Sequence, residues 1–300
     1  MRILNFGSLN IDYVYGVDRF AAKGQTITSR SLDVFPGGKG LNQSIALARA
    51  GADVHHAGQV GQDGVFLREL LESCGVGVES VKVRDDVRSG NAIIQNDAEG
   101  DNCIVLYPGA NRAIDRDFVD QALAEYGQGD WLLLQNEISE LPYIVSCAKA
   151  RGMVIVLNPS PADALLDGVD LDAIDCFVLN EGEAAALTGT NGDGEHLLNA
   201  MHLRFPHAQI VLTLGEDGSM YMRGDEVLAQ RAYLVETVDT TAAGDTFTGY
   251  LLADLAGGEP IAHALDFAAR ASALAVSKKG AAPSIPMREE VAGFTPSMRS

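Results

Sequence analysis

The runs Trp131-Leu-Leu-Leu134 and Val154-Ile-Val-Leu157 decide the fold class of this chain. Both are short apolar stretches bounded by turn residues, a pattern typical of strands that are buried on both faces of a sheet. Similar runs occur at Ile3–Phe6, Cys176–Leu179 and Ile210–Leu214. Such strands alternate with helical segments, which indicates a largely parallel sheet covered on both faces. The sequence therefore predicts an α/β fold.

Two of the intervening segments show helical periodicity. In Leu41–Ala50 the apolar residues Leu41, Ile45 and Ala48 recur at helical spacing. Asp63–Gly75 is also predicted to be a helix, and its expected apolar face consists of Phe66, Leu67, Leu70, Leu71 and Cys74.

Two stretches interrupt the alternation of strands and helices. Residues 12–36 contain alternating segments without a helical stripe, and residues 89–106 are typical of a hairpin around Asn96-Asp-Ala-Glu-Gly100. The two insertions could form a small separate sheet or be ordinary surface hairpins, and the pattern alone leaves both open. The whole chain, 1–300, is otherwise predicted to be one catalytic domain, since no linker or repeat divides it.

The charge balance excludes some classes of partner. Lys and Arg total 22 against 41 Asp and Glu, which gives a formal net charge of −19. Such a surface repels phosphate backbones and anionic lipid, so we expect neither nucleic acid nor membrane as a partner. An anionic ligand must instead be held by a local site of backbone amides and isolated cations.

The cysteines and the N-terminus indicate a cytoplasmic protein. Cys74, Cys103, Cys147 and Cys176 are far apart, without metal-ligand spacing, and are expected to be reduced thiols. The first apolar run is too short for a signal peptide and is predicted to be a strand. Neither a P-loop nor a Gly-x-Gly-x-x-Gly fingerprint occurs, which disfavours a dinucleotide-dependent oxidoreductase.

The sharpest candidate site is Val238-Asp-Thr-Thr-Ala-Ala-Gly-Asp-Thr-Phe-Thr-Gly249. A helical pattern begins near Ala243, so Ala242, Ala243 and Gly244 lie in the turn that opens a helix. Free N–H groups and the helix dipole make such a turn an anion site. Asp245 in the first turn can then accept a proton from a hydroxyl that attacks phosphorus. The alternative is that Asp245 only complements the helix dipole.

Two further segments are candidates for binding a small polar ligand. Phe35-Pro-Gly-Gly-Lys-Gly-Leu-Asn42 precedes a helix, and its glycines suggest a backbone pressed against a ligand that Lys39 and Asn42 hydrogen-bond. Gly7-Ser-Leu-Asn-Ile-Asp12 follows the first strand, where open α/β sheets bind ligands. Taken alone, each segment could equally be a simple turn.

Together these segments resemble the ribokinase-like (pfkB-type) carbohydrate kinases. The resemblance covers essentially the whole chain in order. Its motifs are Gly7-Ser-Leu-Asn-Ile-Asp12, Gly37-Gly-Lys-Gly-Leu-Asn42, Gly109-Ala-Asn111, Leu157-Asn-Pro-Ser-Pro-Ala162, Asn180-Glu-Gly-Glu183, Leu212-Thr-Leu-Gly215, Asp239–Asp245 and Lys279-Gly-Ala-Ala-Pro-Ser284.

The resemblance implies ATP-dependent phosphorylation of a sugar, with the 5-hydroxyl of D-ribose as the expected acceptor. It makes Asp245 the catalytic base and the amides of Ala242, Ala243 and Gly244 the anion hole. The positions expected to hold the sugar are Asn10, Asp12, Gly38, Lys39, Gly40, Asn42, Glu137 and Asp245. The alternatives are a related sugar or nucleoside kinase and a catalytically silent sugar-binding protein.

The resemblance also implies cofactor sites. Asn180 and Glu183 match a motif associated with Mg²⁺ and the nucleotide phosphates. The remaining ATP-binding positions are Thr213, Gly215, Gly218 and Gly244. A K⁺ site of mostly main-chain oxygens is expected at Asp239, Thr241, Ala275, Lys278, Gly280 and Ser284. By the same resemblance, a three-layer α/β/α sandwich carries the two β insertions as a lid that also forms a homodimer contact.

Overall fold

In a computed structural model, residues 1–99 and 101–295 are described, and their main feature is a nine-stranded sheet. Its strands are β1 (Arg2–Phe6), β4 (Asp53–Gly61), β5 (Gly77–Arg84), β8 (Trp131–Gln135), β9 (Val154–Asn158), β10 (Cys176–Asn180), β11 (Gln209–Thr213), β12 (Ser219–Arg223) and β13 (Glu226–Gln230). The strand order is β13-β12-β11-β10-β9-β8-β1-β4-β5. All neighbours are parallel except β11–β12 and β12–β13, which are antiparallel. This confirms the predicted α/β fold with a mostly parallel sheet.

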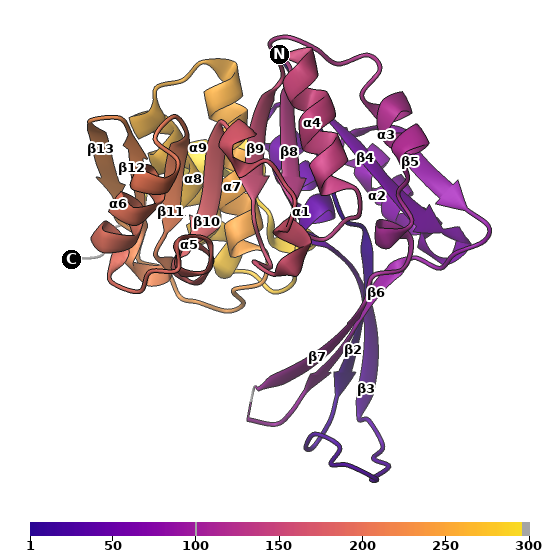
Figure 1. The fold of residues 1–300 in the computed structure, drawn as a ribbon. Helices are drawn as coiled ribbons and strands as arrows, with labels where there is room; N and C mark the ends of the chain where they lie inside the picture. Colours follow the sequence, from indigo (N-terminus) through magenta and orange to yellow (C-terminus); the bar gives the residue numbers. More distant parts are fainter. Residues whose placement is uncertain (100, 296–300) are drawn as a thin grey trace.

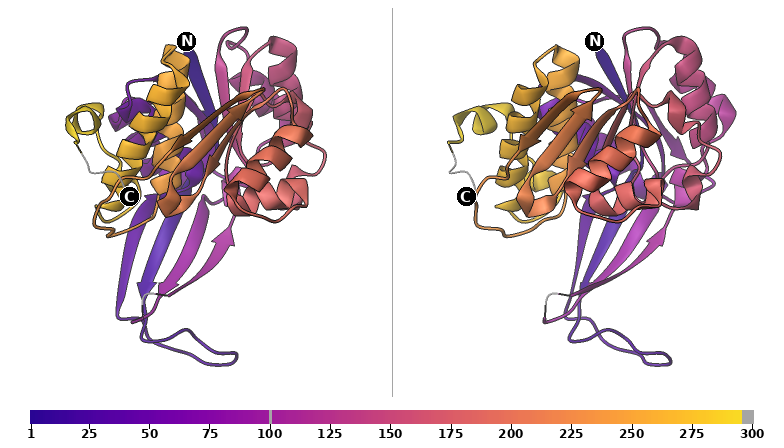
Figure 2. Two further views of the ribbon diagram at one scale, coloured as in Figure 1. Left: turned by 90° about the vertical axis from the view of Figure 1, so that its left-hand side faces the viewer. Right: turned by 60° about the vertical axis from the view of Figure 1, so that its left-hand side comes forward.

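Helices cover both faces of the sheet and make three layers (Figures 1 and 2). One apolar core contains residues from α1 (Lys39–Arg49), α2 (Val65–Ser73), α7 (Ala243–Gly257), α8 (Ile261–Val276) and α9 (Arg288–Gly293). The other contains residues from α3 (Arg116–Ala122), α4 (Leu141–Arg151), α5 (Glu181–Thr188) and α6 (Gly194–Arg204). Successive strand side chains point to opposite faces, so the all-apolar runs read from the sequence supply both cores.

Several details differ from the sequence-based expectation. Phe66 is 38% exposed, so it lies outside the buried face that Leu67 and Leu71 form on α2. Leu214 follows β11 instead of belonging to it, because the chain turns there toward β12. The strands β4, β5, β12 and β13 gave no clear signal, because polar residues interrupt β4 and β5 and the apolar runs of β12 and β13 are only three residues long.

The two β insertions form one separate four-stranded sheet that projects from the body (Figure 1). Its strands are β2 (Asn10–Gly16), β3 (Ser31–Gly37), β6 (Gly90–Asn96) and β7 (Asn102–Tyr107), in the order β3-β2-β6-β7. Parallel pairing of β2 with β6 joins the two insertions, which are distant in sequence. Of the two alternatives, the structure has the separate sheet and not independent hairpins.

The helices α1 and α7 pack against each other at a glycine. A Cβ at Gly249 would lie 2.4 Å from the Cβ of Ala46, so only glycine allows this separation. The close contact brings the N-terminal turns of both helices to the same edge of the sheet. Within the described residues, no helix is both long and apolar enough to cross a membrane.

Candidate active site

Asp245 lies in the first turn of α7 and is held by two amides from α1. Asn42 donates through Nδ2 to Asp245 Oδ2 at 3.0 Å, and Gln43 donates through Nε2 to Asp245 Oδ1 at 2.9 Å. The turn before it contains Ala242 in the left-handed conformation, with φ of 61°. Both carboxylate oxygens therefore have fixed directions at the end of a helix whose first N–H groups lack intrahelical acceptors.

The turn that opens α7 is the predicted anion hole. The N–H of Ala243 donates to the Thr240 carbonyl at 3.2 Å, so this amide has a partner before any ligand binds. Gly244 is exposed and belongs to the first turn, where the helix dipole adds positive potential. The turn thus supplies oriented donors next to the Asp245 carboxylate.

A second group of charges lies around Lys39, the first residue of α1. Burial acts to lower the pKa of Lys39, but the carboxylates of Asp245 and Glu137 outweigh it and raise that pKa. Burial raises the pKa of Glu137, against the opposing effects of Lys39 and of the Ser8 hydroxyl, which donates to Glu137. Burial, together with the Glu137 charge, raises the pKa of Asp12 to about 6. The carboxyl groups of Asp245, Glu137 and Glu183 therefore surround Lys39, and Asp12 lies close to Glu137.

Neighbouring amides orient the remaining sugar-site candidates. Asn111 donates through Nδ2 to Asn10 Oδ1 at 2.8 Å, and its own Oδ1 accepts from the N–H of Leu9 at 3.0 Å. Asn10 is 4% exposed. The Oδ1 of Asn42 is buried and has no hydrogen-bond partner among the residues that the structure describes. Since a buried acceptor without a donor is costly, Asn42 is poised to accept from a ligand hydroxyl.

The glycine-rich turn packs against the chain itself, which differs from the sequence-based interpretation. A Cβ at Gly40 would lie 2.4 Å from the backbone nitrogen of Ser8, and Gly38 has a positive φ of 98°. Close approach to Ser8 therefore explains Gly40 without any ligand. These glycines let the turn place Lys39 beside Glu137, whose Oε2 accepts from the Lys39 N–H at 3.4 Å.

A polar cavity of about 220 Å³ joins several of the predicted residues. Its lining includes Lys39, Asn180, Glu183, Thr213, the turn Ala242–Gly244 and Asp245. The other predicted sugar positions are outside this lining: Asn10, Asp12, Gly38, Gly40, Asn42 and Glu137. Of these, Asn42 contacts Asp245, and Glu137 accepts from the Lys39 N–H. The structure thus brings the predicted base, the anion hole and the Asn-x-x-Glu motif to one cavity.

Asn180 and Glu183 form a capping box at the start of α5. Asn180 Oδ1 accepts from the Glu183 N–H at 2.9 Å, and Glu183 Oε2 accepts from the Asn180 N–H at 3.0 Å. One carboxylate oxygen of Glu183 is therefore engaged in capping the helix. The pair is held rigidly at the cavity wall by this reciprocal contact.

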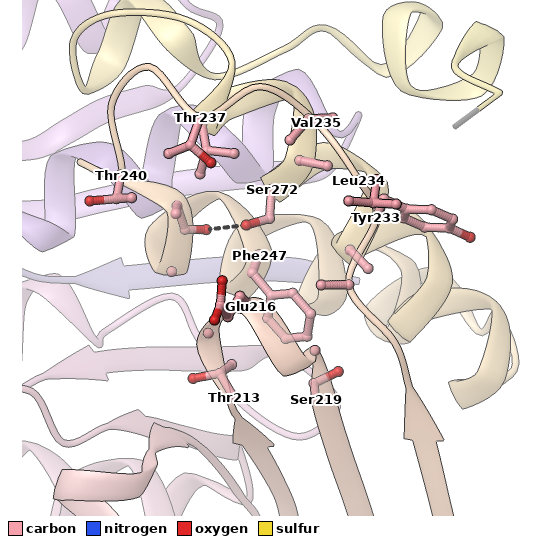
Figure 3. A pocket seen from close by; sticks show the side chains of 18 residues that line it. Thr213, Glu216, Ser219, Tyr233, Leu234, Val235, Thr237, Thr240, Phe247 and Ser272 are labelled. Atoms are coloured by element: carbon pink, nitrogen blue, oxygen red, sulfur yellow. Dashed lines mark hydrogen bonds between the residues drawn. The ribbon is translucent and has the colours of Figure 1, made fainter. Parts of the chain in front are cut away.

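A larger, mostly apolar cavity of about 350 Å³ continues from the polar one. The two share Thr213, Thr240, Ala243 and Gly244. Figure 3 shows the Phe247 ring between Ser272 and Ser219, with Thr213 and Thr240 to one side and Tyr233 to the other. Gly215 and Gly218 belong to the same lining. Together the two cavities suit an elongated ligand with an apolar end and an anionic end that meets the start of α7.

Two loops that carry the predicted cation site meet beside α7. Asp239 accepts from the N–H groups of Thr241 and Gly280, both at 2.9 Å. Burial alone would raise the pKa of Asp239, but the hydrogen bonds from these loops outweigh it and hold the pKa below its usual value. The Asp239 carboxylate thus fixes the two loops to each other.

The other predicted cation residues lie at the end of α8, which contains Ala275, and in the loop after it. The Lys278 ammonium is paired with Glu290 at 2.9 Å, and the Lys278 N–H donates to the Ala275 carbonyl at 3.1 Å. Ser284 donates through its hydroxyl to the Ala281 carbonyl at 2.8 Å. The charged end of Lys278 is therefore engaged elsewhere, and only its main-chain oxygen is available to a cation.

Comparison with known proteins agrees with this geometry. The family model for pfkB family carbohydrate kinases matches residues 2–288. The chain belongs to this family. Like its relatives, this pfkB enzyme is a carbohydrate kinase, a phosphotransferase with the ribokinase-like fold.

Three relatives describe the similarity within the pfkB family. Ribokinase of Staphylococcus aureus (strain COL) is 36% identical over 97% of this chain and 98% of its own length. A ribokinase structure from Cryptococcus neoformans in complex with ADP has a TM-score of 0.86 and 33% identity, covering 97% of this chain and 98% of that one. Arabidopsis thaliana ribokinase complexed with ribose and ATP has a TM-score of 0.86 and 29% identity, covering 98% of this chain and 99% of that one.

Sequence reasoning missed three residues that orient the site. Gln43 holds Asp245, Asn111 holds Asn10, and Ser8 holds Glu137. For Gln43 a signal existed, because Gln43 and Ser44 are polar residues between the apolar Leu41 and Ile45 of an otherwise buried helix. Buried polar side chains need partners, and here the partner is the proposed base.

Proposed function

We propose that this enzyme transfers the γ-phosphoryl group of ATP to the 5-hydroxyl of D-ribose, giving ribose 5-phosphate and ADP. The observation that carries this proposal is the position of Asp245 in the polar cavity, next to Gly244, which lines both cavities, with both carboxylate oxygens oriented by Asn42 and Gln43. The relatives named above as ribokinases, one of them complexed with ribose and ATP, support the choice of substrates.

In the proposed reaction, the oxygen of the sugar hydroxyl forms a bond to the γ-phosphorus of ATP, and Asp245 accepts the proton of that hydroxyl. The bond between that phosphorus and the bridging oxygen breaks, and ADP leaves. The N–H groups of the turn Ala242–Gly244 stabilise the charge on the transferred group. Lys39 adds a positive charge at the same cavity. This charge offsets the repulsion between the acidic surface of the protein and the phosphates of ATP.

Sugar hydroxyls would be held by groups of both donor and acceptor type. Asn42 offers a buried, unpartnered Oδ1, Asp12 and Glu137 offer carboxylates, and Asn10 offers an amide fixed by Asn111. The backbone of Gly38 and Gly40 completes this side of the site. Such a set suits a small polyol better than a nucleoside, whose base favours an apolar slot.

A panel of acceptors tests this substrate choice. With MgATP and K⁺, ADP release should be much faster with D-ribose than with 2-deoxyribose, fructose or adenosine. The matched control omits the acceptor and measures ATP hydrolysis alone. Turnover on adenosine or fructose with inert ribose would favour a related kinase of the family, and ribose binding without any turnover would favour a silent sugar-binding protein.

Asp12 is expected to make sugar binding depend on pH. Burial and Glu137 raise the pKa of Asp12 to about 6, and only its ionised form accepts a hydroxyl hydrogen bond fully. As the pH falls through 6, the Asp12 carboxylate is protonated. The KM for the sugar should therefore rise about tenfold between pH 7 and pH 5. Asp12→Asn, which cannot titrate, is the control and should lose this dependence. A flat KM in the unmodified enzyme would contradict the assignment.

Mg²⁺ is proposed to accompany the nucleotide phosphates. Glu183, held at the cavity wall with Asn180, fits this task, because magnesium in kinases uses one or two carboxylates together with substrate phosphates. When bound, the ion would neutralise charge on the phosphates. Glu183→Gln should therefore raise the Mg²⁺ concentration needed for half-maximal turnover. An unchanged Mg²⁺ titration would contradict this role.

K⁺ is proposed to bind the loops joined by Asp239. The main-chain oxygens of Thr241, Ala275, Lys278, Gly280 and Ser284 suit a monovalent cation, and Thr241 directly precedes the anion hole. A bound cation would rigidify that turn. Replacing K⁺ by tetramethylammonium should therefore lower turnover, whereas equal turnover in both salts would overturn the proposal.

The projecting sheet is proposed to act as a lid and as the contact of a homodimer. Every residue of β7 is exposed, including the apolar run Ile104-Val-Leu106, and Leu32 and Val34 of β3 are about half exposed. Apolar strands left open in this way mark an interaction surface. Sedimentation should give a dimer, and a monomer at micromolar concentration would contradict it.

A further inference from the structure

A chain of buried polar side chains leads from Asp245 into the interior, away from both cavities. Its members come from α1, β8, β1 and β4, and each is 0% exposed. They are Gln43, Gln135, Asn5, Ser44 and His56. None of them belongs to the lining of either cavity. Within this chain, only Gln135 Oε1 lacks a hydrogen-bond partner among the described residues. Since buried polar groups are costly, so many of them in the core indicate that the chain orients a neighbouring group.

The links of this chain are all hydrogen bonds of ordinary length. Gln43 Nε2 donates to Asp245 Oδ1 at 2.9 Å, and Gln43 Oε1 accepts from Gln135 Nε2 at 2.7 Å. Gln135 Nε2 also donates to Asn5 Oδ1 at 2.9 Å. Asn5 Nδ2 donates to Ser44 Oγ at 2.8 Å, and Ser44 Oγ meets His56 Nδ1 at 2.8 Å.

The far end of the chain fixes the direction of every link. His56 Nε2 lies 3.2 Å from the Gly7 carbonyl, which can only accept, so Nε2 carries the proton. Burial lowers the pKa of His56 to about 4, so the ring is neutral at physiological pH and Nδ1 is an acceptor. Ser44 must then donate its hydroxyl proton to Nδ1.

The direction carries through to the base. Asn5 Nδ2 donates one N–H to Ser44 Oγ and the other to the Gly40 carbonyl, both at 2.8 Å. Since both partners accept, the Asn5 amide has only one orientation. Its Oδ1 faces Gln135 Nε2, which in turn faces Gln43 Oε1. The Gln43 amide is thereby held with its NH₂ group toward Asp245, and a flipped amide would place two acceptors against each other.

We propose that Gln43 is a positioning residue for Asp245, and that the Gln135–Asn5–Ser44–His56 chain holds its amide in the donating orientation. Asn42 also donates to Asp245, and its Oδ1 has no partner among the described residues. Gln43 Nε2 makes its shorter contact with Asp245 and also lies 3.4 Å from Asn158 Oδ1. The proposal rests on Asp245 being the base. A base displaced by about 1 Å can cost roughly a hundredfold in rate, so fixing its direction matters for kcat more than for sugar binding.

The first experiment is a double-mutant cycle with Gln43→Met and Asp245→Asn, in which kcat, KM and Tm are measured. Gln43→Met keeps the volume and removes the donor, and is expected to lower kcat roughly 10- to 100-fold with KM for ribose changed less than about threefold. In the Asp245→Asn background the same substitution should cost nothing further, because it acts only through the base. Gln59→Met, at a buried glutamine of β4 outside the chain, is the matched control and should lower Tm without lowering kcat.

The outcomes separate this proposal from the proposed function. If Asp245→Asn keeps its turnover, the base assignment fails. If Asp245→Asn is impaired but Gln43→Met is not, or if the two losses multiply in the double variant, only the role of Gln43 is overturned. Asn5→Leu removes the acceptor of Gln135 and should lower kcat by a smaller factor. An unchanged kcat there would overturn the part assigned to the chain.

Gln43→Glu provides a second test that does not depend on tolerance of an apolar side chain. The substitution keeps the size of the side chain but places a second carboxyl group next to that of Asp245. Two carboxyl groups at this distance share a proton. The other charged groups near Asp245 are Lys39 and Glu137, which are the same in both proteins. The kcat profile of Gln43→Glu should therefore shift to higher pH than that of the unmodified enzyme. Superimposable profiles would contradict a direct contact between residue 43 and the base.

Discussion

Asp245→Asn is expected to lower kcat by roughly a hundred- to ten-thousand-fold, because it removes the group that accepts the proton of the sugar hydroxyl. The amide that replaces the carboxylate keeps the size of the side chain and can still hydrogen-bond a hydroxyl. Sugar affinity should therefore change much less than kcat. Steady-state ADP release measures the first quantity, and titration calorimetry with ribose measures the second.

The result distinguishes chemistry from binding. Asn42 and Gln43 both donate to the Asp245 carboxylate, so an asparagine at 245 also loses one accepting oxygen, and a modest loss of stability is expected. A thermal melt controls for that effect. Near-normal kcat in a folded Asp245→Asn protein would mean that another group accepts the proton, and the proposed role of this helix turn would be wrong.

Gly249→Ala is expected to have the largest effect of any substitution outside the cavities. The added Cβ would lie 2.4 Å from the Ala46 Cβ and 2.9 Å from the Leu47 backbone nitrogen, so α1 and α7 must move apart. Overpacking of this kind costs about 1–3 kcal/mol of stability. Because Asn42 and Gln43 lie on α1 and Asp245 on α7, separation of the helices also disturbs the base, and kcat should fall roughly a hundredfold.

The matched control is Gly257→Ala in the same helix. A Cβ at Gly257 meets no atom within 4 Å, so this variant should retain full activity and gain up to about 1 kcal/mol from helix propensity. Tm and kcat of the two alanine variants are compared directly. Equal behaviour of both would show that the approach of α1 to α7 does not control the geometry of the base.

The fold was largely predictable because buried parallel strands leave a strong signal. Trp131–Leu134, Val154–Leu157 and Cys176–Leu179 are apolar throughout and fall within β8, β9 and β10. The edge and hairpin strands were harder to predict, since the apolar runs of β12 and β13 are only three residues long between polar ends. The local pattern left open whether the two β insertions pair with each other, and only the family resemblance favoured it, because parallel pairing of β2 with β6 is a long-range contact that leaves no local pattern.

Candidate site residues could be proposed from the sequence, but the side chains that orient them could not. Asp245 was identified because a helix opened by small residues has physical consequences that can be read from sequence. Gln43 and Asn111 act by orienting other side chains, and whether a polar residue points at a neighbouring element depends on how elements pack. The reciprocal capping of Asn180 and Glu183, by contrast, follows from their spacing of three and could have been anticipated.

The central claim is that the enzyme phosphorylates D-ribose at its 5-hydroxyl at the expense of ATP. The most direct test is ³¹P NMR of the reaction of the purified enzyme with D-ribose, MgATP and K⁺. The account predicts a phosphate monoester on the 5-hydroxyl, formed in equal amount to ADP, and no inorganic phosphate beyond the control without sugar. A phosphate on another hydroxyl, or ADP accompanied only by inorganic phosphate, would contradict it.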